Sequence, residues 1–165
     1  MKEIFLSQLC GYWYLFTVDQ VQLVLPLAEA PVPFNRADRI WLQTSDGKTA
    51  ELCPLSLLFS WGAHQAVVHD HFLLLHHGER LLALPMQGSG YYGSARIETM
   101  RPLPPAFSAL SRQMIPALLV NGREVFMQID LGTLVQAMDK IAYLRKQKQL
   151  LVRQEQGVKG GAHAE

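Results

Sequence analysis

The strongest constraint on the fold of this chain lies in residues 115–138, where a hairpin pattern leads directly into a helix pattern. An apolar run, the dipeptide Asn121-Gly122 and an alternating run follow one another in residues 115–128. Asn-Gly tolerates positive φ at both positions and is therefore typical of a tight hairpin turn. Asp130 stands where a helix N-cap is needed, and helical spacing then relates Leu134, Val135, Met138, Ile141 and Ala142. The segment predicts a β-hairpin followed by a C-terminal helix.

Short β-like runs separated by turn residues fill most of the chain before residue 100. The expected strands cover residues 4–8, 12–18, 21–26, 39–45, 48–53, 67–75, 80–84 and 94–100. Three turn dipeptides join consecutive runs: Cys10-Gly11, Asp46-Gly47 and His77-Gly78. Turn-linked pairs with little helix between them predict an antiparallel sandwich or barrel rather than βαβ units. Residues 72–75 are apolar on both faces, so we expect this strand to be central and covered on each side.

The C-terminal helix changes character after Leu144. The basic tract Arg145-Lys146-Gln147-Lys148 interrupts the apolar spacing, which resumes at Leu150. Such a tract meets an acidic partner or a membrane surface in some proteins, and it is also typical of the solvated end of a terminal helix. Residues 158–165 contain two adjacent glycines and few apolar groups, so we expect a mobile tail. We therefore divide the chain into a domain at residues 1–140 and a basic helical extension with a tail at 141–165.

Composition restricts the class of protein. The 165 residues are 49% hydrophobic and carry a net charge of +1, which fits one domain and weighs against a nucleic-acid binder. An apolar run near the N-terminus is interrupted by Ser7 and Gln8 and lacks a small-residue cleavage site, and no apolar segment is long enough to insert in a membrane. We expect a cytoplasmic protein. Cys10 and Cys53 fit either two buried thiols or one disulfide.

A glycine-rich stretch at residues 88–93 matches the G-x-G-x-x-G pattern of dinucleotide sites. Such a site needs a helix after the last glycine, whereas residues 94–99 alternate like a strand. The carboxylate that would bind a ribose is also missing at its usual distance along the chain. We interpret the stretch as a flexible glycine loop that displays Tyr91 and Tyr92, and we expect no cofactor.

Five histidines lie between residues 64 and 77. In a strand, His69 and His71 would point to the same face about 7 Å apart, which suits shared contact with one zinc or copper ion. A third ligand would come from His64 or His77. The alternative is a solvated strand entrance with polar side chains, which we favour because nothing else supplies metal-ligand spacing. A metal-binding protein or metal-dependent enzyme is therefore our second hypothesis.

Other catalytic patterns are weak. The sequence contains no G-x-S-x-G nucleophile elbow, and no histidine is matched by spacing to Ser56, Ser60 or Ser89. Paired carboxylates suited to acid–base catalysis are not visible as a motif. The residues therefore favour a protein that is not an enzyme.

The order of the elements resembles that of the CheW-like domain, the chemotaxis coupling fold shared by the adaptor CheW and the regulatory domain of the kinase CheA. The similarity covers roughly residues 2–138 and depends on order and spacing rather than on one motif. Pro33-Phe34 is similar to the family's "PPF" entry, and Ala50-Glu51-Leu52-Cys53-Pro54 begins a segment similar to "VPVVDLRLRF". Residues 72–84 resemble the family's paired strands, residues 100–107 its "IKPAPEF" segment, and residues 115–134 its closing hairpin and helix.

This resemblance implies a mainly β protein with two linked five-stranded β-barrels and a C-terminal α-helix. It also implies a non-enzymatic adaptor whose partner is a CheA-like histidine kinase, a chemoreceptor or both. The family's "NLRG" hairpin tip would fall at Thr44-Ser45-Asp46-Gly47, where Asp46 replaces the arginine that serves partner contacts. A reversed charge there disfavours the same acidic partner.

Six residues near the expected loops are our candidates for a partner interface. Tyrosine and arginine are enriched in protein interfaces, and charged loop residues can set partner choice. Ordinary solvent-exposed surface is the alternative for each. The candidates are Arg36, Asp38, Asp46, Arg80, Tyr91 and Tyr92.

Overall fold

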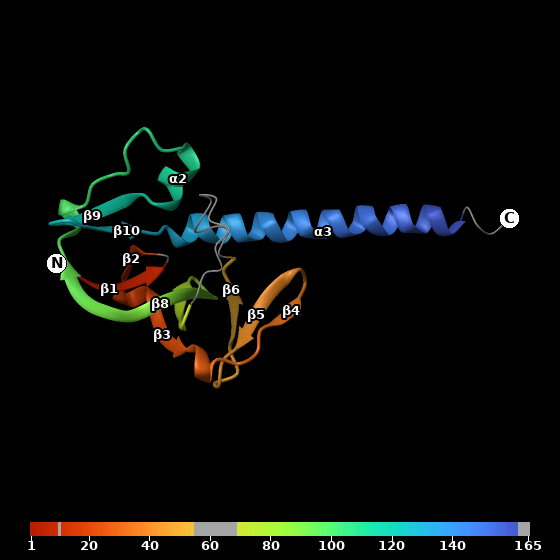
Figure 1. Cartoon of the computed structure of the whole chain (residues 1–165), viewed down its shortest axis with the longest axis horizontal. Helices are drawn as coiled ribbons and strands as arrows, with labels where there is room; N and C mark the ends of the chain where they lie inside the picture. Colours follow the sequence, from red (N-terminus) through yellow and green to blue (C-terminus); the bar gives the residue numbers. More distant parts are fainter. Residues whose placement is uncertain (10, 55–68, 162–165) are drawn as a thin grey trace.

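The computed structural model describes residues 1–9, 11–54 and 69–161, and Figure 1 shows a strand-rich body from which one long helix projects. Within this part of the chain the strands are β1 (Lys2–Leu9), β2 (Tyr12–Thr17), β3 (Val21–Pro26), β4 (Phe34–Arg36), β5 (Arg39–Gln43), β6 (Thr49–Leu52), β7 (His71–His77), β8 (Arg80–Ala95), β9 (Ala117–Asn121) and β10 (Glu124–Gln128). The helices are α2 (Ala109–Met114) and α3 (Leu131–Gly161), with 3-10 turns η1 (Val18–Gln20), η2 (Leu27–Glu29) and η3 (Ile97–Thr99).

All ten strands belong to one sheet, in which β8 is shared by two halves. The order is β4-β5-β6-β8-β1-β2-β10-β9, with β7 also paired to β8 and β3 paired to β7. The first residues of β8 pair with β6 and β7, while residues 87–95 pair with β1. The mainly β class with a C-terminal helix is therefore confirmed. The described strands fall into two halves that share β8, which is roughly consistent with the two linked five-stranded barrels that we expected, although the sheet is not closed.

The glycine-rich stretch is not the flexible loop that we expected. It is part of β8, and its register against β1 shifts between Leu6 and Gln8, which indicates a β-bulge where β8 passes from one half to the other. Gly88 adopts φ +67°, a left-handed conformation that favours glycine. At Gly90 an added Cβ would lie 2.0 Å from Cζ of Phe5, so only glycine leaves room for this buried ring.

The predicted hairpins are confirmed where short loops join paired strands. β1 pairs with β2, β5 with β6, β7 with β8 and β9 with β10, all antiparallel. In the last hairpin Asn121 lies opposite Glu124, so the turn residues are Gly122 and Arg123, one position later than predicted. Gly122 has φ +62°, as this turn requires.

Residues 72–75 form the central strand that the apolar pattern predicted. Leu73 and Leu75 pack in one buried cluster, whereas Phe72 and Leu74 pack in a second cluster on the other face. β7 also has a neighbour on each side, β3 and β8. Cys53 is buried in the first cluster as a free thiol, and burial raises the pKa of that thiol to about 12. The predicted alternative of a disulfide is therefore wrong.

Asp130 caps the N-terminus of helix α3, as the sequence predicted. The backbone N–H of Thr133 donates to Oδ2 of Asp130 at 2.9 Å. Residues Leu131, Leu134, Val135 and Met138 then belong to the main core cluster. The boundary expected at residue 140 falls inside this helix, and residues 158–161, expected in a mobile tail, are its last turn. Residues 162–165 lie outside the described residues.

The strand expected at residues 94–100 is shorter than predicted. Residues 94–100 were expected to be extended, but β8 ends at Ala95 and η3 follows. The backbone N–H and the hydroxyl of Thr99 both donate to the carbonyl of Arg96, at 3.0 Å and 2.6 Å. A threonine that bonds the backbone three residues back favours a turn over a strand.

Candidate functional site

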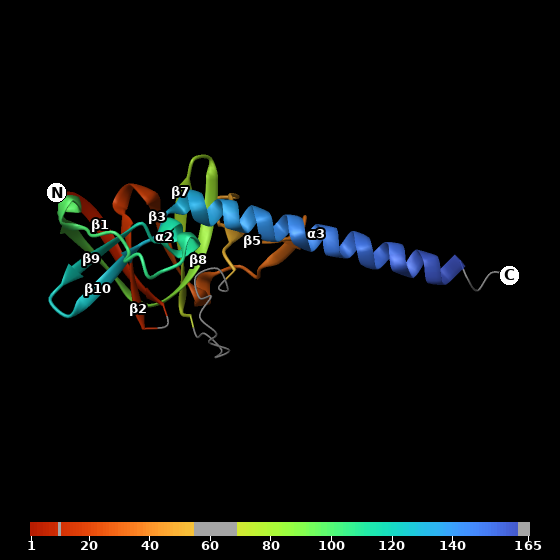
Figure 2. The same cartoon turned by 90° about the horizontal axis from the view of Figure 1, so that it is seen from above.

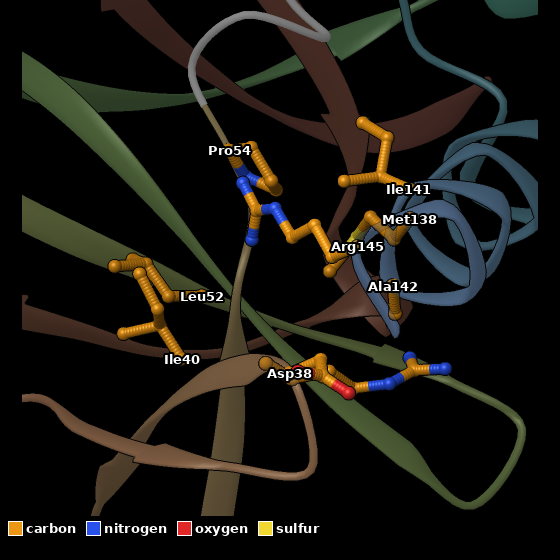
Figure 3. A pocket seen from close by; sticks show the side chains of 9 residues that line it. Asp38, Ile40, Leu52, Pro54, Met138, Ile141, Ala142 and Arg145 are labelled. Atoms are coloured by element: carbon orange, nitrogen blue, oxygen red, sulfur yellow. The ribbon is translucent and has the colours of Figure 1, made fainter. Parts of the chain in front are cut away.

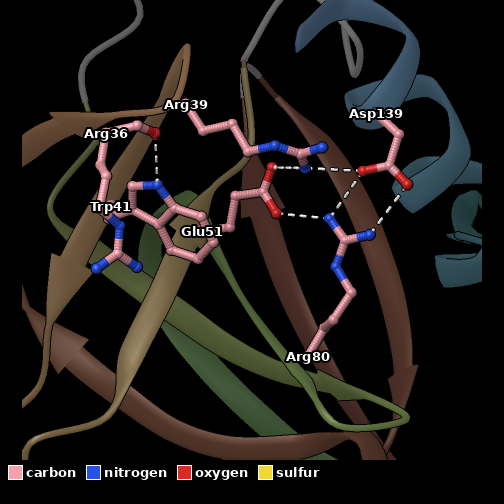
Figure 4. Close-up of polar contacts among 6 residues, drawn as sticks. All are labelled: Arg36, Arg39, Trp41, Glu51, Arg80 and Asp139. Atoms are coloured by element: carbon pink, nitrogen blue, oxygen red, sulfur yellow. Dashed lines mark hydrogen bonds and ion pairs between the residues drawn. The ribbon is translucent and has the colours of Figure 1, made fainter. Parts of the chain in front are cut away.

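Four charged side chains from four separate elements meet where α3 leaves the sheet (Figure 4). Arg39 of β5 donates through Nη1 to Oε1 of Glu51 on β6 and to Oδ1 of Asp139 on α3, both at 2.7 Å. Arg80 of β8 donates through Nη2 to Oε2 of Glu51 at 2.6 Å and to Oδ1 of Asp139 at 3.0 Å. Two cations and two anions make the cluster neutral, and it joins three strands to the helix.

Burial within this cluster is uneven. The Glu51 side chain is only 4% exposed, whereas that of Asp139 is 44% exposed. Hydrogen bonds from Arg80 and, further, from Arg39 outweigh partial burial and hold the pKa of Asp139 below its ordinary value. A buried carboxylate is strongly unfavourable without its cations, so Glu51 depends on both arginines. The cluster is therefore a fixed tether between sheet and helix rather than a set of free interface charges.

A small groove opens beside the tether, between the sheet and the first turns of α3 (Figure 3). Apolar side chains from both sides line it, and charged ones stand at its rim: Asp38, Arg39, Ile40, Leu52, Pro54, Met138, Ile141, Ala142 and Arg145. Its volume is about 60 Å³. Pockets for small molecules typically measure at least about 300 Å³, so this groove suits at most one side chain of a protein partner.

The candidate residues Arg36 and Asp38 lie in the hairpin between β4 and β5. The Arg36 guanidinium lies 5.2 Å from the ring centroid of Trp41, and Nε1 of Trp41 donates to the Arg36 carbonyl at 3.1 Å. Ala37 and Asp38 have φ +52° and +62°, which non-glycine residues adopt rarely. The cation–π contact and the indole hydrogen bond help hold this strained turn at the exposed end of the sheet.

Asp46 lies at the opposite end of β5, in the turn before β6. It is exposed, and its carboxylate accepts hydrogen bonds from the Thr44 hydroxyl and, at 3.4 Å, from the Lys48 backbone. The Thr44 and Lys48 hydrogen bonds hold the pKa of Asp46 below its ordinary value. The carboxylate thus stabilises its own turn while one face remains available to a partner.

Tyr91 and Tyr92 lie on the part of β8 that pairs with β1. Adjacent strand residues point to opposite faces of a sheet. The Tyr91 ring lies 5.8 Å from Trp13, and the Tyr92 ring meets Phe5 edge to face at 4.9 Å. Both tyrosines remain more than half exposed. They are ordered aromatic groups on a strand, not groups displayed on a flexible loop.

The structure therefore distributes the six candidates over three places. Arg80 and the Arg36–Asp38 hairpin lie on the side of the sheet near the tether, Asp46 lies at the far end of β5, and the tyrosines lie in the other half. Sequence reasoning missed Arg39, Glu51 and Asp139. Their contacts span 12 to 100 residues of sequence, and no local pattern signals such pairs. The one available hint was a carboxylate, Glu51, between the apolar residues Ala50 and Leu52 of a short strand.

The expected metal-site geometry, with His69 and His71 on the same face of one strand, is not found. β7 begins at His71, so His69 precedes the strand and its ring packs against Phe72 at 5.2 Å. Nδ1 of His71 lies 2.6 Å from Asp70, and Nε2 lies 3.5 Å from Ser7 Oγ. Among the described residues, no three histidine, cysteine, aspartate or glutamate side chains are grouped to hold a metal ion. Of the two suggested third ligands, His77 is the last residue of β7 and His64 lies outside the described residues.

Ser7 contacts His71, which in turn contacts Asp70, as serine, histidine and aspartate do in a hydrolase triad. The burial of Ser7 and His71 instead indicates a structural role. Ser7 is fully buried, and the Ser7–His71 separation is at the limit of a hydrogen bond. Oδ2 of Asp70 accepts the backbone N–H of Gly88 at 2.9 Å. The chain of contacts thus fixes the bulge at which β8 passes between the two halves, and a substrate has no access to the hydroxyl.

The fold is similar to that of a protein of known structure. A search of protein-family models and a search of curated proteins each find no match. Among solved structures, the scaffolding protein CheW from Thermoanaerobacter tengcongensis superposes with a TM-score of 0.61 at 14% identity, over 79% of this chain and 84% of that one. The fold is therefore CheW-like, in a chain that has diverged far in sequence.

No helix within the described residues combines the length and apolar character needed to cross a membrane.

Proposed function

We propose that this chain is a non-enzymatic adaptor that binds a signalling protein, a CheA-like histidine kinase regulatory domain or a chemoreceptor. The observation that supports the proposal is the extensive structural similarity to a scaffolding protein. The absence of a motif for catalysis in the sequence agrees with it, and we propose a cytoplasmic location. The fold alone does not define a function, so the proposal depends on surfaces that can be tested.

We place the partner surface on the two hairpin ends of β5 and on the exposed tyrosines. The β4–β5 turn offers Arg36 and Asp38 on a strained, fixed backbone, and the β5–β6 turn offers Asp46. Aromatic and arginine side chains held in place lose little entropy on binding. Arg80 remains a candidate because its side chain is 35% exposed, although both its carboxylate partners belong to the tether.

The experiment is a binding titration against a purified histidine kinase regulatory domain and against a receptor cytoplasmic segment. Asp46→Asn keeps an oxygen that can accept the Thr44 and Lys48 hydrogen bonds but removes the charge. Asp46→Arg reverses it. We expect affinity to change at least about fivefold for Asp46→Arg and less for Asp46→Asn, because a charge at a polar rim mainly sets partner choice.

The matched control is Glu124→Gln, an exposed carboxylate at the β9–β10 hairpin of the other half. It should leave binding unchanged. The absence of binding to both purified partners, or equal losses for Asp46→Arg and Glu124→Gln, would reject the proposed surface.

A further inference from the structure

The distal part of α3 carries an apolar face that the rest of the molecule does not use. The helix projects past the sheet in both views (Figures 1 and 2), and every residue from Tyr143 to Gly161 is exposed. These 19 residues extend about 28 Å at 1.5 Å per residue. Arg145, near the start of this segment, the distal helix, stands at the rim of the groove, but none of the segment's side chains is buried in the fold.

Apolar residues of the distal helix repeat at helical spacing. Tyr143 and Leu150 are seven residues apart, as are Leu144, Leu151 and Val158. At about 100° per residue they form one stripe roughly 120° wide, with Gln147 and Gln154 at its centre. The five apolar residues are between 42% and 75% exposed. A seven-residue apolar repeat is typical of a helix that packs along another helix.

The stripe does not continue the core face of α3. The buried residues of the docked part, such as Leu134 and Met138, point about 170° away from the centre of the stripe when the same rotation per residue is applied. On the stripe's side of the docked part stand Gln136 and Lys140, which are exposed. The apolar face therefore changes sides near Tyr143, so it cannot serve packing against this chain's own sheet.

Charge decides which partner suits this stripe. Five cations and one anion give the distal helix a net charge of +4: Arg145, Lys146, Lys148, Arg153 and Lys159 against Glu155. A second copy would bring two such segments together, and like charges along a helix pair are unfavourable. An acidic amphipathic helix would instead complement both the stripe and its basic flanks.

The two glutamines favour a protein partner over a lipid surface. Gln147 and Gln154 lie within the apolar stripe, and hydrocarbon offers an amide no hydrogen-bond partner. At a helix–helix seam the same amides can bond across to a partner and fix its register. We propose that residues 143–161 are a docking helix for an acidic amphipathic helix of another protein. This surface is separate from the adaptor surface proposed above and does not depend on it.

The test uses the full chain and two synthetic probes. Each probe is a three-heptad helical peptide with leucine core positions, flanked either by glutamate or by lysine. Fluorescence anisotropy of the labelled peptides should show binding of the glutamate peptide at least about tenfold tighter than of the lysine peptide, with a marked weakening in high salt. Equal binding of both peptides would overturn the proposal.

Matched variants separate the stripe from the general charge of the helix. Leu144→Gln combined with Leu151→Gln removes the stripe without changing charge and should weaken glutamate-peptide binding at least about tenfold. Val152→Gln replaces an exposed apolar residue on the other side of the helix and should change binding less than about twofold. Circular dichroism checks that both variants keep the helix. If Val152→Gln weakened glutamate-peptide binding as much as the double variant does, the proposed docking face would be rejected.

Two further measurements examine the competing occupants. Sedimentation equilibrium of the full chain tests self-association. We expect no self-association that depends on the stripe, so the wild type and the Leu144→Gln, Leu151→Gln double variant should sediment alike. Vesicles containing phosphatidylserine should bind more weakly than the glutamate peptide. Stripe-dependent self-association or tighter vesicle binding would overturn the proposal. The double variant should retain kinase or receptor binding. Failure of the docking-helix proposal and failure of the adaptor proposal therefore give different results.

Discussion

The two parts of α3 are one continuous helix with opposite relationships to the rest of the protein. In the docked part, residues 131–142, buried side chains enter the main core and Asp139 joins the ion-pair tether. In the distal helix, residues 143–161, every side chain is exposed. A helical pattern by itself therefore does not determine where the apolar face of the helix packs.

The docked part gains its stability from tertiary contacts, whereas the distal helix depends on local terms. Helices in water are marginal without packing, but a helix already nucleated in the core extends at low cost. Glu155 and Lys159 at four-residue spacing, and the position of Lys159 in the last turn, support this extension.

Truncation of a core side chain in the docked part should have the largest effect. Leu134 is fully buried in the main cluster, so Leu134→Ala should lower the free energy of unfolding by about 3 kcal/mol. Urea denaturation followed by far-UV circular dichroism measures this loss. Leu150→Ala on the exposed distal helix is the control and should change stability by less than about 0.5 kcal/mol. Similar losses in both variants would mean that the distal helix is packed in solution.

Removal of the buried charge of the tether should have the next largest effect. Glu51→Gln leaves two guanidinium groups facing only Asp139 and should cost about 2 kcal/mol, below the usual cost for a buried pair because both arginines are partly exposed. Glu124→Gln, an exposed carboxylate of β10, should cost almost nothing. Thermal denaturation of both variants provides the measurement. An unchanged midpoint for Glu51→Gln would show that the tether does not stabilise the fold.

Removal of the Asp139 charge, which the helix contributes to the tether, should have a smaller and pH-dependent effect on stability. The pKa of Asp139 is held below its ordinary value of 3.8, so its charge stabilises the fold above that pH and this stabilisation disappears as pH falls through the lowered pKa. Asp139→Asn should cost about 1 kcal/mol at pH 7, since the carboxylate is 44% exposed. Wild type and variant should converge in stability as the pH is lowered below about 4. A constant difference in stability between wild type and Asp139→Asn down to pH 2 would contradict this account.

The parts of the fold that depend on neighbouring residues were predictable from the sequence. Turn dipeptides such as Asp46-Gly47 and the N-cap Asp130 act over a few residues, and the structure confirms both. The order of such elements also sufficed to predict the CheW-like fold. The glycine stretch was misjudged because Gly90 is required by Phe5, a residue 85 positions away, and not by any local property.

The candidate site was less predictable for the same reason. Arg39 and Asp139 meet across 100 residues of sequence, and an isolated arginine or aspartate gives no sign of its partner. The distal helix is an intermediate case. Its apolar repeat was present in the sequence, but the basic tract obscured it, and only the position of the core face showed that the stripe lies on the opposite side.

Prolines at matched positions in the two parts of α3 give the sharpest contrast, and the distal one gives the smallest expected change in global stability. Gln149→Pro breaks the distal helix, and helical ellipticity should fall by the contribution of up to about 13 residues, while the free energy of unfolding changes by less than about 0.5 kcal/mol. The matched substitution Gln136→Pro lies at an exposed position of the docked part and should cost about 3 kcal/mol, because the break there also disturbs the core contacts of Leu134 and Met138. Both replace an exposed glutamine of one helix, so the difference measures how far that helix is coupled to the fold. If Gln149→Pro cost as much as Gln136→Pro, the distal helix would be part of the cooperative unit and its apolar stripe would already have a partner within this protein.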